Sequence, residues 1–321
     1  MSNKLRTILL QIAVLIVCPV YICYCQNPNL TYFGYYHGDM EFDKKTHHGF
    51  VANNIDDMGK LNNCNVVIFS VWPGWYVENP DKFYERVQLA AKYKMKVLLN
   101  VYSVFFQWKK EKMQPDWQKR WANYKKLITP KITDKILGFY IDEPKQSGIK
   151  ECDFRLATKR IRKDFPDKEL ISVISVFALR NNLPASYLEY CTGLGFDYYE
   201  GSWKEQDITQ NPQKSYYALF EKFKTKIAPK QHLWLIPKAF RRIDFESKNK
   251  AIDDIKHWYK LAQNELRVKG ILNFSFASYW AEYNPIGARQ LFDENNTYYD
   301  ENLKRVHINI GRKIISKKSK H

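Results

Sequence analysis

Short apolar runs alternate with amphipathic segments along most of the chain. Eight runs rich in β-branched and aromatic residues have the length of strands: Leu30–Tyr36, Asn65–Trp72, Lys96–Tyr102, Ile136–Ile141, Leu170–Phe177, Gly193–Tyr199, His232–Pro237 and Gly270–Tyr279. Several of these runs are continuously apolar, which is typical of parallel strands covered on both faces. Between them, apolar side chains recur at helical spacing over Asp81–Tyr93, Asp116–Leu127, Phe154–Phe165, Lys214–Ile227 and Lys250–Val268.

This alternation predicts an α/β fold, specifically a single (β/α)₈ TIM barrel. An open doubly wound sheet is the alternative. The segment after the first predicted strand, Gly34–Asp39, lacks the glycine spacing of a phosphate-binding loop, which disfavours that alternative. No internal boundary interrupts the pattern. We therefore expect one barrel domain over residues 26–310, followed by a basic C-terminal tail over residues 311–321.

The first 25 residues carry a different signal. Lys4 and Arg6 precede an apolar run over Ile8–Val20, and short residues follow around Cys25. This order is that of a secretory signal peptide, so we expect a secreted, extracellular or periplasmic protein. The run is shorter than the roughly 20 residues that a spanning helix needs, so no stable membrane anchor is expected.

Composition narrows the class of partner. The chain has 51 Lys and Arg against 34 Asp and Glu, a formal net charge of +17, and 16% of its residues are aromatic. The basic residues are spread along the predicted helices, which argues against nucleic acid as a partner. We expect a monomer. Its aromatic residues exceed what a core requires, so we expect some of them to line a ligand surface. The expected substrate is a carbohydrate, and acidic carbohydrates are among the candidates.

Polar and aromatic residues gather where the predicted strands end. In a (β/α)₈ barrel the carboxyl ends of the strands form the active site. Aromatic faces beside carboxylates suit a sugar ring, whose C–H face packs on the ring while its hydroxyls bond to polar groups. The candidate substrate-binding residues are Tyr36, Asp39, Trp72, Tyr102, Tyr198, Trp203, Trp280 and Glu282.

The sharpest motif is Leu137–Pro144, which ends in Asp142-Glu143-Pro144. It resembles the fourth-strand signature of the large retaining clan of (β/α)₈ glycoside hydrolases, in which Asn-Glu-Pro ends the strand. The resemblance implies that Glu143 is the general acid/base and that Asp142 replaces the Asn that binds the sugar 2-hydroxyl. It also implies that Trp280 stacks on a sugar, that O-glycosidic bonds of an oligo- or polysaccharide are hydrolysed, and that no cofactor is needed.

One departure from the clan matters for mechanism. The clan places a nucleophilic Glu after the seventh strand, but here His232–Pro237 is followed by Lys238, without a carboxylate. A second catalytic carboxylate must therefore come from elsewhere. Glu200 is the first choice, since it follows the sixth predicted strand; the other candidates are Asp197, Asp39 and Glu282.

The adjacency of Asp142 and Glu143 has a physical consequence. If both side chains reach the site, the charge of Asp142 raises the pKa of Glu143, as a general acid near neutral pH requires. Neighbouring strand residues normally face opposite sides, so this arrangement needs the strand to end or bulge at that point.

Two other functions remain open from the sequence. The bare seventh strand also fits a carbohydrate-binding barrel without turnover. A metal-dependent hydrolase could use His37, Asp39 and Glu143, although we expect no metal, because the chain lacks further histidines with metal-ligand spacing.

Overall fold

The computed structural model describes residues 27–42, 49–107, 112–181, 183–244, 246–278 and 285–317. The predicted signal peptide, Trp280 and Glu282 lie outside the described residues. No helix in the described ranges is both long and apolar enough to cross a membrane.

The eight predicted strands all form, and they close into one parallel barrel. Hydrogen bonds join them in the order β1-β11-β9-β8-β7-β6-β5-β4, and β4 pairs with β1 to complete the ring. The strands are β1 (Tyr32–Tyr35), β4 (Val66–Phe69), β5 (Lys96–Asn100), β6 (Ile136–Ile141), β7 (Glu169–Ser175), β8 (Gly193–Asp197), β9 (His232–Ile236) and β11 (Val268–Asn273). The predicted (β/α)₈ fold is confirmed.

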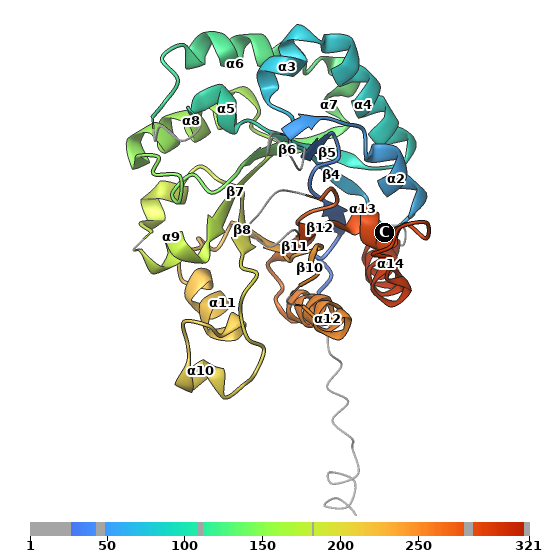
Figure 1. The fold of residues 1–321 in the computed structure, drawn as a ribbon. Coiled ribbons are helices and arrows are strands. Elements are labelled where there is room, and N and C mark those ends of the chain that lie inside the picture. Colours follow the sequence, from blue (N-terminus) through green and yellow to red (C-terminus); the bar gives the residue numbers. More distant parts are fainter. Residues whose placement is uncertain are drawn as a thin grey trace, which may run out of the picture.

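Helices surround the strands, as Figure 1 shows. They are α2 (Ile55–Lys60), α3 (Pro73–Glu78), α4 (Pro80–Lys92), α5 (Tyr102–Phe105), α6 (Trp117–Lys125), α7 (Pro130–Thr133), α8 (Glu151–Asp164), α9 (Val176–Arg180), η1 (Ala185–Leu188), α10 (Asp207–Gln210), α11 (Tyr216–Lys224), α12 (Lys248–Asn264), α13 (Ala288–Phe292) and α14 (Glu301–Ile315). The five predicted helices correspond to α4, α6, α8, α11 and α12. Helix α12 ends before Val268, because that residue already begins β11.

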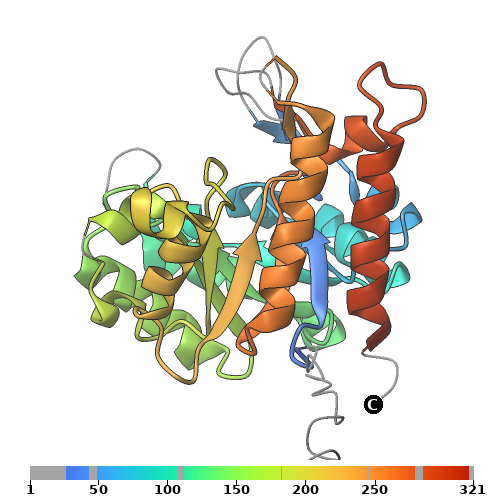
Figure 2. The same cartoon turned by 90° about the horizontal axis from the view of Figure 1, so that it is seen from below.

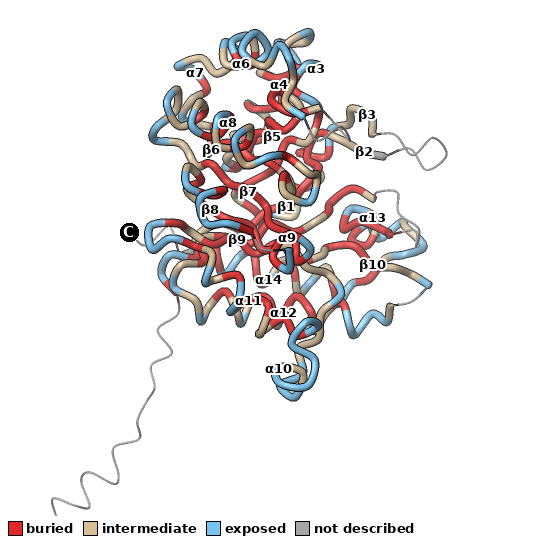
Figure 3. Tube along the Cα trace, turned by 90° about the vertical axis from the view of Figure 1, so that its left-hand side faces the viewer, coloured by how far each residue is buried: buried red, intermediate tan, exposed pale blue. Residues whose placement is uncertain are grey.

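Side chains from alternate strand positions fill the barrel interior: Tyr32, Tyr36, Val66, Ile68, Leu98, Tyr140, Ile171, Val173, Trp234, Ile236 and Leu272. The largest of them, Trp234, fits because the strands on either side carry glycine beside it. A Cβ atom on Gly193 would lie 2.7 Å from the indole nitrogen, and one on Gly270 would lie 2.4 Å from the ring. A second apolar layer packs between the strands and the helices, so the strands are the most buried part of the chain (Figure 3).

Smaller elements decorate the barrel. A hairpin of β2 (Met40–Phe42) and β3 (Gly49–Val51) follows β1, and β10 (Arg241–Arg242) pairs with β12 (Pro285–Ile286). Helices α12 and α14 lie side by side against the barrel (Figure 2). Helix α14 continues into the predicted basic tail as far as Ile315, because Ile314 is buried on its apolar face.

Candidate active site

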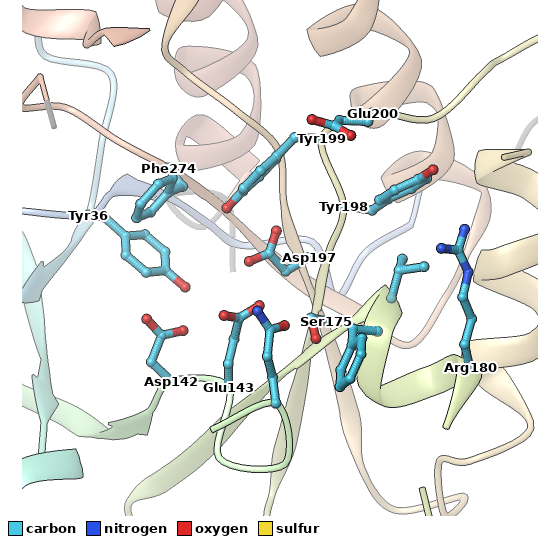
Figure 4. A pocket seen from close by; sticks show the side chains of 13 residues that line it. Tyr36, Asp142, Glu143, Ser175, Arg180, Asp197, Tyr198, Tyr199, Glu200 and Phe274 are labelled. Atoms are coloured by element: carbon cyan, nitrogen blue, oxygen red, sulfur yellow. The ribbon is translucent and has the colours of Figure 1, made fainter. Parts of the chain in front are cut away.

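A cavity of about 410 Å³ opens at the carboxyl ends of the barrel strands, where the sequence places the active site. It lies over β6, β7 and β8, and Figure 4 shows its wall. The lining residues are Tyr36, Asp142, Glu143, Gln146, Ser175, Val176, Phe177, Arg180, Asp197, Tyr198, Tyr199, Glu200 and Phe274.

The end of β6 brings two consecutive carboxyl groups into this cavity. The strand ends at Ile141, and Glu143 then adopts a left-handed backbone conformation with φ of 34°. Such a φ is unusual for a non-glycine residue. A turn holds it, since the Ser147 amide donates to the Glu143 carbonyl at 3.0 Å. The alternation of strand faces therefore no longer applies, and both acids line the cavity, as the predicted pKa effect requires.

The pKa values of both acids are raised. Burial raises the pKa of Glu143 to about 8, with a further contribution from the charge of Asp142. Burial likewise raises the pKa of Asp142 to about 6, and a hydrogen bond from Tyr140 opposes this rise. Glu143 therefore holds its proton near neutral pH, where an ordinary glutamate is ionised.

A third carboxyl group comes from β8. Asp197 is the last residue of that strand, two strands from β6 in the barrel, and faces the space occupied by Glu143 (Figure 4). Burial raises the pKa of Asp197 well above its usual value, and the charges of Glu143 and Asp142 raise it further. The three acids therefore interact electrostatically and titrate together.

A chain of hydroxyl groups positions Asp142. The Tyr140 hydroxyl donates to Asp142 Oδ1 at 2.6 Å, and the Tyr36 and Tyr140 hydroxyl oxygens are 2.5 Å apart. Because the single proton of Tyr140 points to Asp142, Tyr36 is the donor to Tyr140. This chain orients the Asp142 carboxylate and favours its ionised form.

Glu200, the predicted second catalytic carboxylate, is more exposed than Asp197 and lies at the edge of the cavity. Its side chain is 64% exposed at the edge of the cavity and accepts a hydrogen bond of 2.8 Å from Arg242 Nη1. The neighbouring Tyr198 lines the cavity, and so does Tyr36; both remain candidates for substrate binding. Trp72 is 45% exposed at the start of α3 and does not line the cavity.

Three other candidate substrate-binding residues have structural partners away from the cavity wall. Asp39 is buried and accepts hydrogen bonds from the Ser70 amide and the Tyr76 hydroxyl, both at 2.6 Å. Trp203 donates to Asp254 at 3.1 Å, and Tyr102 is buried in the apolar layer. Asp39 thus links the segments that follow β1 and β4 by hydrogen bonds. This structural role accounts for a carboxylate at that strand end, and no ligand is needed to explain it.

The seventh barrel strand, β9, contributes no acid to the cavity. Lys238, two residues after the strand ends, forms buried ion pairs with Glu246 and, at 3.0 Å, with Asp254. These two acids are balanced by lysines and do not line the cavity. The departure from the clan at this strand is therefore also present in the structure.

The residues described by the model hold no group of three or more His, Cys, Asp and Glu side chains able to bind a metal ion. His37 is buried, which lowers its pKa to about 3, and Asp39 is occupied by its hydrogen bonds. The proposed metal set of His37, Asp39 and Glu143 does not assemble.

Sequence reasoning missed part of the cavity wall, namely Gln146, Ser175, Phe177, Arg180, Tyr199 and Phe274. The predicted fifth strand extended to Phe177, whereas β7 ends at Ser175, whose hydroxyl accepts from the Ala178 amide and begins α9. The serine three residues before that amide is an N-cap signal that could have located the strand end.

No protein-family model matches the chain, and no curated protein matches its sequence. Among solved structures, it is similar to an endo-β-1,4-glucanase from Xanthomonas axonopodis pv. citri, with 11% identity and a TM-score of 0.59 over 89% of this chain and 99% of that one. It is also similar to a family 1 β-glucosidase from Thermotoga maritima, with 11% identity and a TM-score of 0.56 over 89% and 98%.

A third similar structure is a β-glucuronidase from Ruminococcus gnavus, with 13% identity and a TM-score of 0.56. The match covers 88% of this chain, which spans 51% of the glucuronidase. These similarities show that the chain shares the (β/α)₈ barrel fold of these three enzymes, which is the fold that the resemblance implied.

Proposed function

We propose that the protein hydrolyses O-glycosidic bonds of an oligo- or polysaccharide. The observation that carries the proposal is the placement of Glu143: a carboxyl with a raised pKa, inside an aromatic-lined cavity at the carboxyl end of a barrel, facing other acids. An acid that is protonated near pH 7 can donate its proton to the departing oxygen of a glycoside.

Asp197 is the better choice for the second catalytic carboxylate. A glycosidase needs one carboxyl group on each side of the scissile bond. Asp197 enters from β8 and Glu143 from β6, whereas Glu200 is solvent-exposed and paired with Arg242. Asp197 therefore acts either as the nucleophile or as the general base that activates a water molecule. The distance between the carboxyl groups of Asp197 and Glu143 determines which of these roles it takes.

Asp142 assists the reaction in two ways. As an ionised group held by Tyr140, it stabilises the positive charge that develops on the sugar ring in the transition state. Its charge also favours the protonated form of Glu143.

Two groups of substrates test this assignment. The wild-type chain is assayed on natural oligosaccharides and on 2,4-dinitrophenyl glycosides, whose leaving group needs little protonation. E143Q should lose on the order of 10²–10⁴-fold in kcat on the natural substrate but much less on the dinitrophenyl glycoside. D197N should lose activity on both.

The outcome also distinguishes the second candidate function, a carbohydrate-binding barrel without turnover, which the bare end of β9 favours. If the wild-type chain binds oligosaccharides but cleaves none of the substrates, carbohydrate binding replaces hydrolysis as the proposed function. Equal losses for E143Q on both substrate groups would remove Glu143 from the role of general acid.

We further propose that residues 1–25 direct export and are removed, which rests on the charge and hydropathy pattern of those residues. Expression of the full chain in a secreting host should give a mature protein that begins near Gln26. An N-terminal sequence that still starts at Met1 would contradict this.

A further inference from the structure

The cavity has two chemically different ends. The acids Asp142, Glu143 and Asp197 occupy one end. The other is formed by α9 and the residue after β8, and we call it the α9 wall: Phe177, Arg180 and Tyr198. Phe177 is 58% exposed although it lines the cavity, so it offers a free aromatic face next to a cation.

Arg180 is held in place by neutral groups. Its Nη2 donates to the Gln213 carbonyl oxygen, and the guanidinium also hydrogen-bonds the Tyr198 side chain, toward which it points in Figure 4. A guanidinium has five N–H donors, so these two partners leave donors unused. In the described part of the chain, no carboxylate lies within 4.0 Å of Arg180. Arg242, by contrast, is paired with Glu200.

Arg180 is also not the counterion of the acid cluster. The pKa of Glu143 responds to burial and Asp142, and that of Asp197 responds to burial, the two neighbouring acids and Tyr199. Neither shift has Arg180 among its causes, and among the described residues its guanidinium has no carboxylate at ion-pair distance. The charge of Arg180 is therefore available to an anionic group that enters the cavity. A planar guanidinium binds carboxylate or sulfate oxygens through paired hydrogen bonds.

We propose that the substrate is an anionic glycan, and that Arg180 binds the carboxylate or sulfate of a sugar unit whose ring packs on Phe177. The inference rests on the proposed function, since it assigns the substrate class of the same cavity. Arg180 is then a specificity-determining residue, which acts beside the acids that carry out the reaction.

Binding measurements test this on the full mature chain carrying E143Q, which prevents turnover. The probes are an oligouronide, the same oligosaccharide with its carboxyl groups reduced to alcohols, and a sulfated neutral oligosaccharide. Calorimetry should show at least roughly tenfold tighter binding of one anionic probe than of the reduced one. The preferred probe identifies the anion as a carboxylate or a sulfate.

Substitutions then assign the preference to Arg180. R180Q should bring the affinities for anionic and neutral probes within about twofold, and R180K should retain part of the difference. R305Q, an exposed arginine on α14, is the matched control and should leave the preference intact. Equal binding of all probes, no binding of any probe, or an equal loss for every probe in R180Q would overturn the proposal.

The two proposals can fail separately. If the wild-type chain cleaves neutral and anionic glycans with the same kcat/KM, hydrolysis stands and the anionic preference fails. If no glycan is cleaved but the Arg180-dependent preference is measured, the preference stands and hydrolysis fails.

Discussion

At the scale of single residues, the site depends on how three acids share protons. Burial raises the pKa of each acid. The charge of Asp142 raises the pKa of Glu143 further, and the charges of both raise the pKa of Asp197 further. The motif at 142–144 predicted Glu143 and this effect. It could not decide between Asp197 and Glu200, because these two acids, three positions apart at the end of β8, differ in exposure only after the chain folds.

The charge of Asp142 can be removed with little change in shape. In D142N the pKa of Glu143 should fall, because the repulsion that favours its protonated form is lost. The alkaline limb of the kcat/KM profile should therefore move to lower pH by about 1 unit. An unchanged limb would show that another group controls it.

Asp197, the last residue of β8, and Glu200, three residues further on, allow a direct comparison between two neighbouring acids. D197N should lower kcat/KM by on the order of 10³-fold, because Asp197 faces Glu143 inside the cavity. E200Q should stay within about tenfold of the wild type, since Glu200 is exposed and paired with Arg242. Both are measured on the same substrate, and the reverse ranking would restore Glu200 as the second catalytic carboxylate.

At the scale of elements, the strands were predictable and their ends were not. Continuous apolar runs such as Val66–Phe69 reflect burial on two faces, a property that each strand carries by itself. The end of a strand depends on turns and caps formed with other residues, as with Ser175 at β7 and the left-handed Glu143 after β6. Because the cavity is built from strand ends, Phe177 and Arg180 of the α9 wall escaped prediction.

The packing of Trp234 against the glycines of the two neighbouring strands can be tested by substitution. In G270A the added methyl would lie 2.4 Å from the indole ring, so the strand or the ring must shift. We expect a loss of about 1–3 kcal/mol in the free energy of unfolding, measured by chemical denaturation. Adding W234F should recover part of that loss, because a smaller ring leaves room for the methyl. Additive effects of the two changes would contradict this explanation.

At the scale of the whole molecule, the closed barrel keeps a hydrophobic interior directly beneath a cluster of acids. Tyr140 belongs to both, since its ring packs in the barrel interior and its hydroxyl donates to Asp142. The fold class could be predicted from eight regularly spaced strand patterns in the sequence, without knowing which strands contact one another. The position of the acid cluster over β6, β7 and β8 required the barrel order of the strands as well as their sequence.

This arrangement links the stability of the molecule to pH. Because the pKa of Glu143 is about 8 in the folded chain and its ordinary value is near 4.5, the folded state holds a proton that the unfolded state releases between these values. The free energy of unfolding should therefore fall as pH rises through this window. E143Q has no such proton, so its free energy of unfolding should exceed that of the wild type by about 5 kcal/mol at pH values above the window and match it below. Denaturation curves recorded across the window measure the difference, with E200Q as an exposed control that follows the wild type. Parallel curves for E143Q and the wild type would show that Glu143 is not held in its protonated form by the fold.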